Sequence, residues 1–333
     1  MIPAGILVPL FLSAATGIQA NPIGRLVDLG GHRLHVHCIG RGSPTVVVEN
    51  GFDEFSFDWV LVQQRLAGIT RTCTYDRAGY AWSDPGPKPR TFAQICLELR
   101  EALSKLGEGR PYVLVGHSFG GGAVRYFAEA YPRDVAGIVL VESIEEEQRI
   151  PIQGKAVRLR DLSEGKTIPA PHLDMPPPDQ PVLPSSADLS APAALEPPFD
   201  RLPADAQRLH RWAESQPSMQ DARASEGAWS PEYFALWHAR PQEGSLGDVP
   251  LLVLTRAEGG YGDNLDVPAA QLDSERKERQ AHLAQLSSNG YQCIIRAGHN
   301  MQLEAPDAVA EAIKEVIQAV RHRTPAGGHS PRP

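Results

Sequence analysis

The chain has 333 residues, 42% of them hydrophobic, which is enough for one large α/β domain with an insertion or for two small domains. Its formal net charge is −8 and its basic residues form no stripe, so nucleic acid is not an expected partner. Past the N-terminus no run of about 18 uncharged apolar residues occurs, which excludes an internal transmembrane helix.

The N-terminal segment is apolar. Residues 1–24 carry no charged side chain, and an apolar run over Ile6–Ala15 is followed by the small residue Ala20. This resembles a signal peptide over residues 1–20, so we expect a secreted or periplasmic protein whose mature chain begins near Asn21 and has no integral membrane segment. The usual Lys or Arg near the start is missing, and the alternative is a cytoplasmic protein with an apolar N-terminal helix.

Strand-like and helix-like segments alternate along the chain. The expected eight strands are 23–30, 33–39, 45–49, 70–75, 113–115, 135–141, 251–255 and 291–296. The expected helices are 59–67, 91–106, 123–131, 268–286 and 306–320. The first two strands form an antiparallel hairpin, and the alternation of the others with helices predicts parallel crossovers. The sequence therefore indicates a doubly wound, mostly parallel, eight-stranded α/β sheet.

The pattern changes over residues 145–248. Pro169–Pro203 is rich in proline, and helical fragments are expected at 204–215 and 231–239. We interpret this stretch as a cap inserted into a core made of residues 21–144 and 249–322, with a disordered tail at 323–333. Its aromatic residues either line an apolar substrate pocket or pack the cap onto the core; they are Trp212, Trp229, Tyr233, Phe234 and Trp237.

The segment that organises the chain lies at residues 111–122. A short apolar strand leads into Gly116-His117-Ser118-Phe119-Gly120, which matches G-x-S-x-G, and a helix-like pattern follows. Strand, turn and helix are the context that a nucleophile elbow needs, and the glycines permit a tight turn and close approach. Ser118 is therefore a candidate nucleophile, with backbone N–H groups of the following helix facing a developing oxyanion.

Four motifs together carry a family resemblance. They are Glu49-Asn50-Gly51-Phe52, the loop Tyr75–Ser83, the elbow Gly116–Gly121, and Gly298-His299-Asn300-Met301-Gln302. In this order and spacing they resemble the α/β-hydrolase superfamily over about residues 24–144 and 249–322. The resemblance implies Ser118 as nucleophile, His299 as its base, and the backbone N–H groups of Phe52 and Phe119 as the oxyanion hole, with no cofactor. We expect His117 to be a packing residue.

The acid that orients His299 has more than one candidate. Many family members place it after the strand preceding the last one, where Glu258 and Asp263 stand without a clean match. Others place it one strand earlier, where Glu142 ends a buried apolar strand, and we favour Glu142. Its carboxylate is then expected within about 3.2 Å of an imidazole nitrogen. The run Glu145–Glu147 is interpreted as a solvated face.

These residues predict a serine hydrolase that cleaves a small carboxylic ester or lactone through an acyl-enzyme. By resemblance, Asp at the elbow would indicate a dehalogenase or an epoxide hydrolase. An acyltransferase, a carbon–carbon bond hydrolase, a perhydrolase and a non-catalytic ligand-binding protein of this fold stay open as alternatives.

The four cysteines do not suggest a metal site. Cys38, Cys73, Cys96 and Cys293 are widely spaced and contain no C-x-x-C pair. Buried free thiols are expected, and a Cys38–Cys73 disulfide is the alternative for an exported protein.

Overall fold

The structure is a computed structural model, which describes residues 19–177, 187–190, 194–260 and 266–322. Most of the expected signal peptide, the expected C-terminal tail and the alternative acid Asp263 lie outside the described residues. No helix within those ranges is long and apolar enough to cross a membrane.

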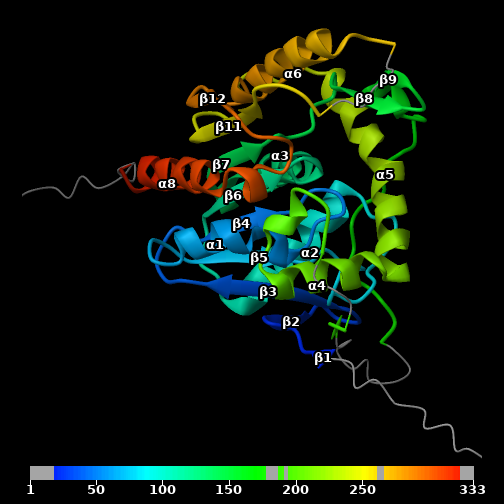
Figure 1. Ribbon diagram of the computed structural model, residues 1–333, viewed down its shortest axis with the longest axis vertical. Coiled ribbons are helices and arrows are strands. Elements are labelled where there is room, and N and C mark those ends of the chain that lie inside the picture. Colours follow the sequence, from blue (N-terminus) through cyan, green and yellow to red (C-terminus); the bar gives the residue numbers. More distant parts are fainter. Residues whose placement is uncertain (1–18, 178–186, 191–193, 261–265, 323–333) are drawn as a thin grey trace, which may run out of the picture.

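A single large sheet of eight strands forms the core (Figure 1). Its strand order is β12-β11-β7-β6-β4-β5-β3-β2, with β2 antiparallel to β3, β3 antiparallel to β5, and every other neighbouring pair parallel. This is the predicted doubly wound, mostly parallel sheet. The strands are β2 (Arg25–Asp28), β3 (Arg33–Ile39), β4 (Val46–Glu49), β5 (Thr72–Tyr75), β6 (Tyr112–His117), β7 (Val135–Val141), β11 (Leu251–Arg256) and β12 (Gly290–Ile295).

Helices cover both faces of the sheet (Figure 1). One face packs against α1 (Val60–Leu66) and α8 (Pro306–His322). The other packs against α2 (Phe92–Leu106), α3 (Phe119–Ala130) and α6 (Ala269–Ala284). Short helical segments are η1 (Ser56–Trp59), η2 (Pro132–Asp134) and α7 (Met301–Glu304).

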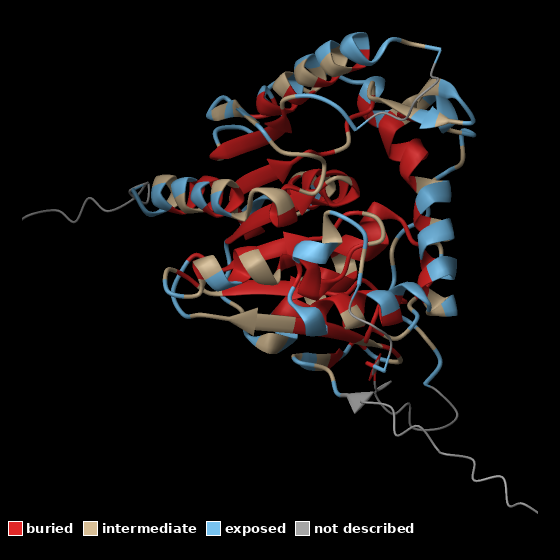
Figure 2. Cartoon of the chain, in the orientation of Figure 1, coloured by how far each residue is buried: buried red, intermediate tan, exposed pale blue. Residues whose placement is uncertain are grey.

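The strand residues explain why both faces are covered. In β4, Val46 and Val48 point toward α1 and α8, whereas Val47 points toward α2 and α3. Successive strand residues alternate between faces, so a strand that is apolar throughout needs a helix layer on each side. Figure 2 shows the resulting buried sheet between its more exposed helices.

The segment 145–248, called the insertion below, adds no strand to the large sheet. It comprises β8 (Arg149–Ile152) and β9 (Lys155–Arg158), which form a hairpin, then η3 (Leu159–Leu162), β10 (Ala187–Asp188), η4 (Phe199–Arg201), α4 (Ala204–Glu214) and α5 (Pro217–His238). β10 pairs with β1 (Gln19–Ala20).

The expected helix at 231–239 is too short, because α5 begins at Pro217 and continues through Pro231. An internal proline removes one backbone donor and disfavours a helix, but buried contacts can outweigh that cost. Met219, Ala222 and Glu226 are buried at helical spacing on the turns before Pro231. This buried stripe carries the helix through the proline.

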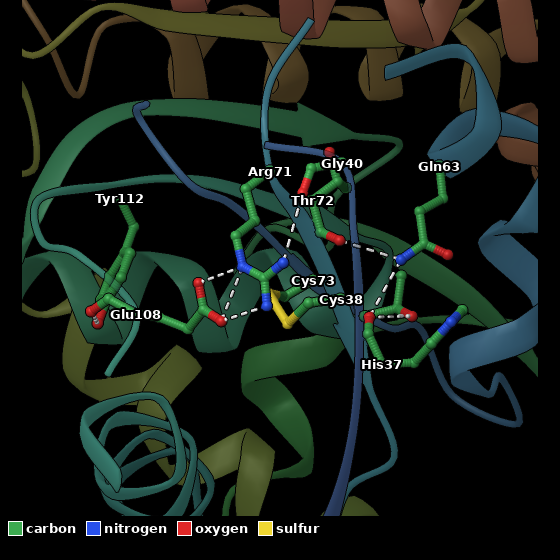
Figure 3. The surroundings of a disulfide bond; sticks show 10 residues. His37, Cys38, Gly40, Gln63, Arg71, Thr72, Cys73, Glu108 and Tyr112 are labelled. Carbon is green, nitrogen blue, oxygen red and sulfur yellow. Dashed lines mark hydrogen bonds and ion pairs between the residues drawn. A yellow bond between two sulfur atoms is a disulfide. The ribbon is translucent and has the colours of Figure 1, made fainter. Parts of the chain in front are cut away.

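Cys38 and Cys73 form a disulfide that joins β3 to β5 (Figure 3). The expectation of free thiols is therefore wrong for these two residues, whereas Cys96 and Cys293 are free. The two bonded cysteines lie directly opposite each other in the antiparallel pair, with Cα atoms 4.0 Å apart. Their strands are not consecutive in the sequence, since β4 intervenes, so sequence spacing does not reveal the pairing.

Candidate active site

Ser118 lies on the turn between β6 and α3, with φ 49° and ψ −118°. Few residues other than glycine adopt a positive φ, so the surrounding structure must hold this turn. The Ser118 N–H donates to the carbonyl oxygen of Val141 at 3.0 Å. Close packing explains the neighbouring glycines: a Cβ on Gly120 would lie 2.3 Å from the Glu49 oxygen, and one on Gly116 would lie 2.7 Å from the Gly120 oxygen.

A cavity of about 350 Å³ opens beside this turn. Ser118 and His299 both line it, and so do Phe52 and Phe119. The remaining lining residues are Ile144, Gln148, Arg149, Ile150, Pro151, Leu159, Ser230, Phe234, Arg256 and Gly260. The wall is mostly apolar with a few polar groups, as is typical of small-molecule sites.

Phe52 and Phe119 come from two separate segments that meet at the cavity. Phe52 follows β4, and Phe119 is the first residue of α3. Their ring centroids lie 4.2 Å apart. The first N–H groups of a helix have no acceptor within that helix, and the helix dipole makes this end favourable for negative charge. The Phe119 N–H is therefore suited to binding an oxyanion.

His299 lies in the loop between β12 and α7, and its side chain is 40% exposed. Its Nδ1 lies 3.6 Å from Oε2 of Glu142, somewhat longer than the expected 3.2 Å. Nη1 of Arg256 lies 3.1 Å from the same Nδ1. The proton on Nδ1 must point to Glu142 if Nε2 is to accept a proton from a serine, so Arg256 competes with that tautomer.

Glu142 directly follows β7 and is 3% exposed, with φ 44°. Its carboxylate accepts the backbone N–H of Arg256 at 2.7 Å and the Arg256 guanidinium at 2.6 Å. Arg276 Nε lies 3.7 Å away. Burial alone would raise the pKa of Glu142, but His299 and Arg256 together hold this pKa below its usual value. Glu142 is therefore a charged carboxylate next to the imidazole.

The pKa of His299 is lowered. Burial of the ring is the main cause, and the positive charges of His117 and Arg256 add to it, while Glu142 acts in the opposite direction. A lowered pKa keeps the imidazole neutral near pH 7, which is the form that can accept a proton.

The other candidate acids lie elsewhere. Glu258 is exposed in the loop after β11, and within the described part of the chain the carboxylate that pairs with His299 is that of Glu142. The interpretation of 145–147 as a solvated face is wrong for Glu145 and Glu146, which are 4% and 6% exposed. Glu146 pairs with Arg125 at 2.6 Å, and such a long-range pairing is invisible in a charge run.

His117 is more than a packing residue. Its Nε2 lies 2.9 Å from the carbonyl oxygen of His299, and its Nδ1 lies 2.7 Å from Oε1 of Glu54. Burial would lower the pKa of His117, but the Glu54 carboxylate raises it above the usual value. Glu54 also accepts the N–H of Gly51 at 2.7 Å and a Gln302 N–H at 2.7 Å. His117 and Glu54 thus connect the loops that carry Ser118, His299 and Phe52.

Of the five aromatic residues proposed for a substrate pocket, only Phe234 is among the described residues that line the cavity. Tyr233 and Trp237 pack against Phe92 of α2. Trp212 packs against Trp82, and Trp229 lies under the ammonium group of Lys166. The alternative, in which these residues pack the cap onto the core, therefore describes Trp212, Tyr233 and Trp237. Phe234 lines the cavity and also contacts Phe92, and Trp229 contacts Lys166 of the insertion itself.

The only group of potential metal ligands at suitable spacing within the described ranges is Cys38, Cys73 and Glu108. The two sulfur atoms are bonded to each other, and Glu108 accepts two or more hydrogen bonds from Arg71 (Figure 3). A disulfide is a poor metal ligand and the carboxylate already has a cation, so this group does not fit a metal ion.

The model of the alpha/beta hydrolase family matches residues 34–312. A curated AB hydrolase superfamily protein from Gibberella zeae is 32% identical over 107 residues, 31% of this chain and 33% of that protein. Epoxide hydrolase 4 from Mus musculus is 28% identical over 138 residues, 37% of this chain and 38% of that protein. The matches thus span only about a third of the length of these relatives.

Solved structures resemble almost the whole chain. A thermophilic esterase from Thermogutta terrifontis superposes with a TM-score of 0.55 at 19% identity, covering 92% of this chain and 99% of that one. A meta-cleavage product hydrolase from Pseudomonas fluorescens gives 0.56 at 17% identity, covering 90% and 98%. At such low identity the likeness concerns the fold alone.

Proposed function

Because the chain belongs to the alpha/beta hydrolase family, we propose that it is a serine hydrolase that cleaves a small carboxylic ester or lactone through an acyl-enzyme. The observation that carries this proposal is the position of Ser118. It stands on a turn with positive φ and shares one cavity with His299, whose Nδ1 faces the buried carboxylate of Glu142. Nucleophile, base and orienting acid are the set that such chemistry requires.

The proposed reaction has two halves. His299 Nε2 takes the proton of Ser118 as Oγ attacks the substrate carbonyl carbon, and the N–H groups of Phe52 and Phe119 bind the oxygen that becomes negative. The C–O bond to the alcohol then breaks, and His299 returns the proton to that oxygen. In the second half His299 deprotonates a water molecule, which attacks the acyl-enzyme and releases the acid and Ser118. Glu142 stabilises the imidazolium in both halves.

We further propose that the insertion acts as a cap that selects the substrate. Ile150, Leu159 and Phe234 come from it and give the cavity apolar lining, beside the polar Gln148, Arg149 and Ser230 of the same segment. No aspartate or glutamate is among the described residues that line the cavity. An uncharged ester with a short apolar acyl group suits such a wall, since burying apolar surface favours binding.

The central test is Ser118→Ala, with Ser230→Ala as the matched control because Ser230 lines the same cavity from α5. We expect Ser118→Ala to lose p-nitrophenyl butyrate hydrolysis by several orders of magnitude, roughly 10⁴-fold or more, and to lose labelling by a fluorophosphonate probe. Ser230→Ala should keep both. Hydrolysis by Ser118→Ala at more than about 1% of the wild-type rate would remove Ser118 from the mechanism.

Export remains part of the proposal. A disulfide between Cys38 and Cys73 supports an oxidising compartment, because cytosolic thiols are kept reduced. Intact-mass analysis of the protein recovered from its own host tests this. We expect a chain that begins near Asn21. Treatment with an alkylating reagent should add no mass at Cys38 and Cys73 unless the protein is first reduced. Retention of Met1 would overturn the proposal of export.

A further inference from the structure

Arg77 is a fully buried cation next to the cavity. It follows β5, and its side chain is 1% exposed. Such a charge is tolerated only when its donors find acceptors. The five N–H groups of a guanidinium lie in one plane and can bind several acceptors at once in fixed directions. The acceptors that Arg77 binds come from two segments that are distant in the sequence.

Two of these acceptors belong to the loop after β4. Nη1 donates to the carbonyl oxygen of Asn50 at 2.7 Å, and Nη2 donates to that of Gly51 at 2.9 Å. The Gly51 carbonyl and the Phe52 N–H belong to the same peptide unit. A peptide unit is planar, so an arginine that holds the C=O also fixes the direction of the N–H. Hydrogen bonding at the oxygen also polarises the unit, which makes the N–H a better donor.

Arg77 also touches the second segment that bears a proposed oxyanion donor. Its guanidinium carbon lies 5.1 Å from the centroid of the Phe119 ring, and a cation attracts the face of an aromatic ring. The ring of Phe119 in turn contacts that of Phe52. One side chain therefore contacts both of the segments whose N–H groups are proposed to bind the oxyanion.

The insertion supplies the carboxylate that compensates Arg77. Glu226 of α5 is 0% exposed, and its Oε1 accepts from Arg77 Nε at 2.9 Å. Its Oε2 accepts from Arg77 Nη2 at 3.3 Å and from the Tyr80 hydroxyl at 2.7 Å. Oε1 of Glu49 lies 3.2 Å from Nη1 of Arg77. Burial, however, raises the pKa of Glu49 to about 7, so this carboxyl group is only partly ionised near neutral pH. Glu226 is therefore the main counter-charge.

We propose that Arg77 is a positioning residue that holds the Gly51–Phe52 peptide in the orientation needed to bind an oxyanion, and that Glu226 makes this arrangement depend on the docked insertion. The inference rests on the proposed function. Arg77 acts through the backbone and does not touch the substrate. The insertion then takes part in the chemical step as well as in substrate selection.

The test compares Glu226→Gln with Glu98→Gln. Glu98 forms an equally buried pair with Arg90: both side chains are 1% exposed, and the Glu98 oxygens lie 2.6 and 2.7 Å from the guanidinium nitrogens. Its polar partners among the described residues are Arg90, Gln94 and His32, none of which belongs to the loop after β4. Both variants lose the charge of a buried pair. The kcat and KM for p-nitrophenyl butyrate are measured, together with the affinities for butylboronic acid and butyrate. The boronate forms a tetrahedral anion on a serine, whereas butyrate resembles the product.

For Glu226→Gln we expect kcat to fall about 10- to 100-fold with KM nearly unchanged, since misplacing a preorganised group mainly costs transition-state binding. The affinity for butylboronic acid should fall in parallel, while that for butyrate stays the same. Glu98→Gln should change none of these values by more than about threefold per folded molecule. Arg77→Lys, which keeps the charge but loses the planar fork, should behave like Glu226→Gln.

Wild-type kcat and boronate affinity in a folded Glu226→Gln protein would overturn the proposal and assign the pair a purely structural role. If Glu226→Gln does not fold, Glu226→Asp replaces it in the test. Aspartate keeps the negative charge but is one methylene shorter, so its carboxylate lies further from Arg77. The same quantities are measured, and we expect a smaller loss of kcat. Failure of the proposed function is visible separately, because it leaves Ser118→Ala active whatever the Arg77 variants do.

Discussion

Two histidine–glutamate pairs lie side by side at the carboxyl ends of the strands, and their properties are opposite. The rings of His117 and His299 have centroids 4.8 Å apart, and each faces a buried glutamate, Glu54 and Glu142 respectively. His117 is 1% exposed with a raised pKa, whereas His299 is 40% exposed and its pKa is lowered.

The two glutamates differ in how closely they approach their histidines: Oε1 of Glu54 lies 2.7 Å from Nδ1 of His117, whereas Oε2 of Glu142 lies 3.6 Å from Nδ1 of His299. Glu54 otherwise accepts from neutral donors, the Gly51 N–H and the Gln302 amide, and its charge outweighs the effect of burial on the pKa of His117. Glu142 shares its charge between His299, Arg256 and Arg276. At His117 the carboxylate outweighs burial and raises the pKa, whereas at His299 burial prevails and lowers it, which suits the proposed roles of a structural clamp and of a base.

The strongest test of this contrast is His299→Gln. We expect kcat to fall roughly 10⁴-fold or more, because the substitution removes the proposed acceptor of the serine proton, while the fold stays intact. Ester hydrolysis and thermal unfolding are measured together. If His117→Phe were as inactive as His299→Gln per folded molecule, the assignment of the two roles would be wrong.

Next in size is the effect of Glu142→Gln. The amide keeps the shape but loses the charge that stabilises imidazolium, so kcat should fall by about 10² to 10⁴. Glu258→Gln is the control, since that side chain is exposed, and it should stay within about twofold of wild type. If Glu142→Gln has nearly the kcat of wild type, Glu142 is not the orienting acid, and the acid must be sought in the loop after β11.

His117→Phe should cost stability more than catalysis. It leaves the buried Glu54 without its cation, which costs about 3 to 5 kcal/mol in the free energy of unfolding. His35→Phe is the matched control, because it also breaks a buried histidine–carboxylate pair. His35 is 0% exposed, and its Nδ1 lies 2.7 Å from Oδ2 of Asp76. Both should unfold more easily in urea, but only His117→Phe should lower kcat, by about 10-fold, through the displaced His299 carbonyl.

The stability that His117 contributes should also depend on pH. Its pKa is raised in the folded state, so the contribution is fully present below the unfolded pKa near 6.5 and is lost as the pH rises through the folded pKa. The difference in unfolding free energy between wild type and His117→Phe should therefore shrink at alkaline pH. A difference that grows with pH would contradict a charged His117.

The smallest expected effect is that of Arg256→Met. Removing this cation should raise the pKa of His299, so the acid limb of kcat/KM moves to higher pH. Arg149→Met is the control, because Arg149 also lines the cavity but pairs with Glu275. A shift to lower pH in Arg256→Met would mean that Arg256 acts mainly by orienting Glu142.

The sequence predicts those parts of this molecule that depend on local patterns. The turn at Ser118 follows from its glycines and from the strand and helix around it, and Glu142 could be proposed by counting strands. Arg256 and Glu54 could not be found in this way, because they reach His299 and His117 through contacts between distant segments. The burial of Glu146 escapes for the same reason, and the Cys38–Cys73 disulfide could be named only as an alternative to free thiols.

The position of the aromatic residues of the insertion is a second feature that the sequence does not predict. Composition indicates an apolar surface in residues 212–237 but does not tell whether that surface faces a ligand or the protein. Both Phe234 and Tyr233, its neighbour in the sequence, contact Phe92, but of the two only Phe234 also lines the cavity. Adjacent helical residues point about 100° apart, so only the docking angle of α5 decides which one meets the substrate.

The backbone at Ser118 and Glu142 affects how this protein responds to selection. Both are non-glycine residues with positive φ, a conformation that costs on the order of 1 to 3 kcal/mol each. Glycine has no such penalty, so a library screened only for heat resistance should enrich glycine at Ser118 and lose turnover in doing so. At Glu142 the same change would remove a buried partner of Arg256 and Arg276, which costs more than the relieved strain, so glycine is not expected there. Thermal stability and catalysis thus favour different residues at Ser118.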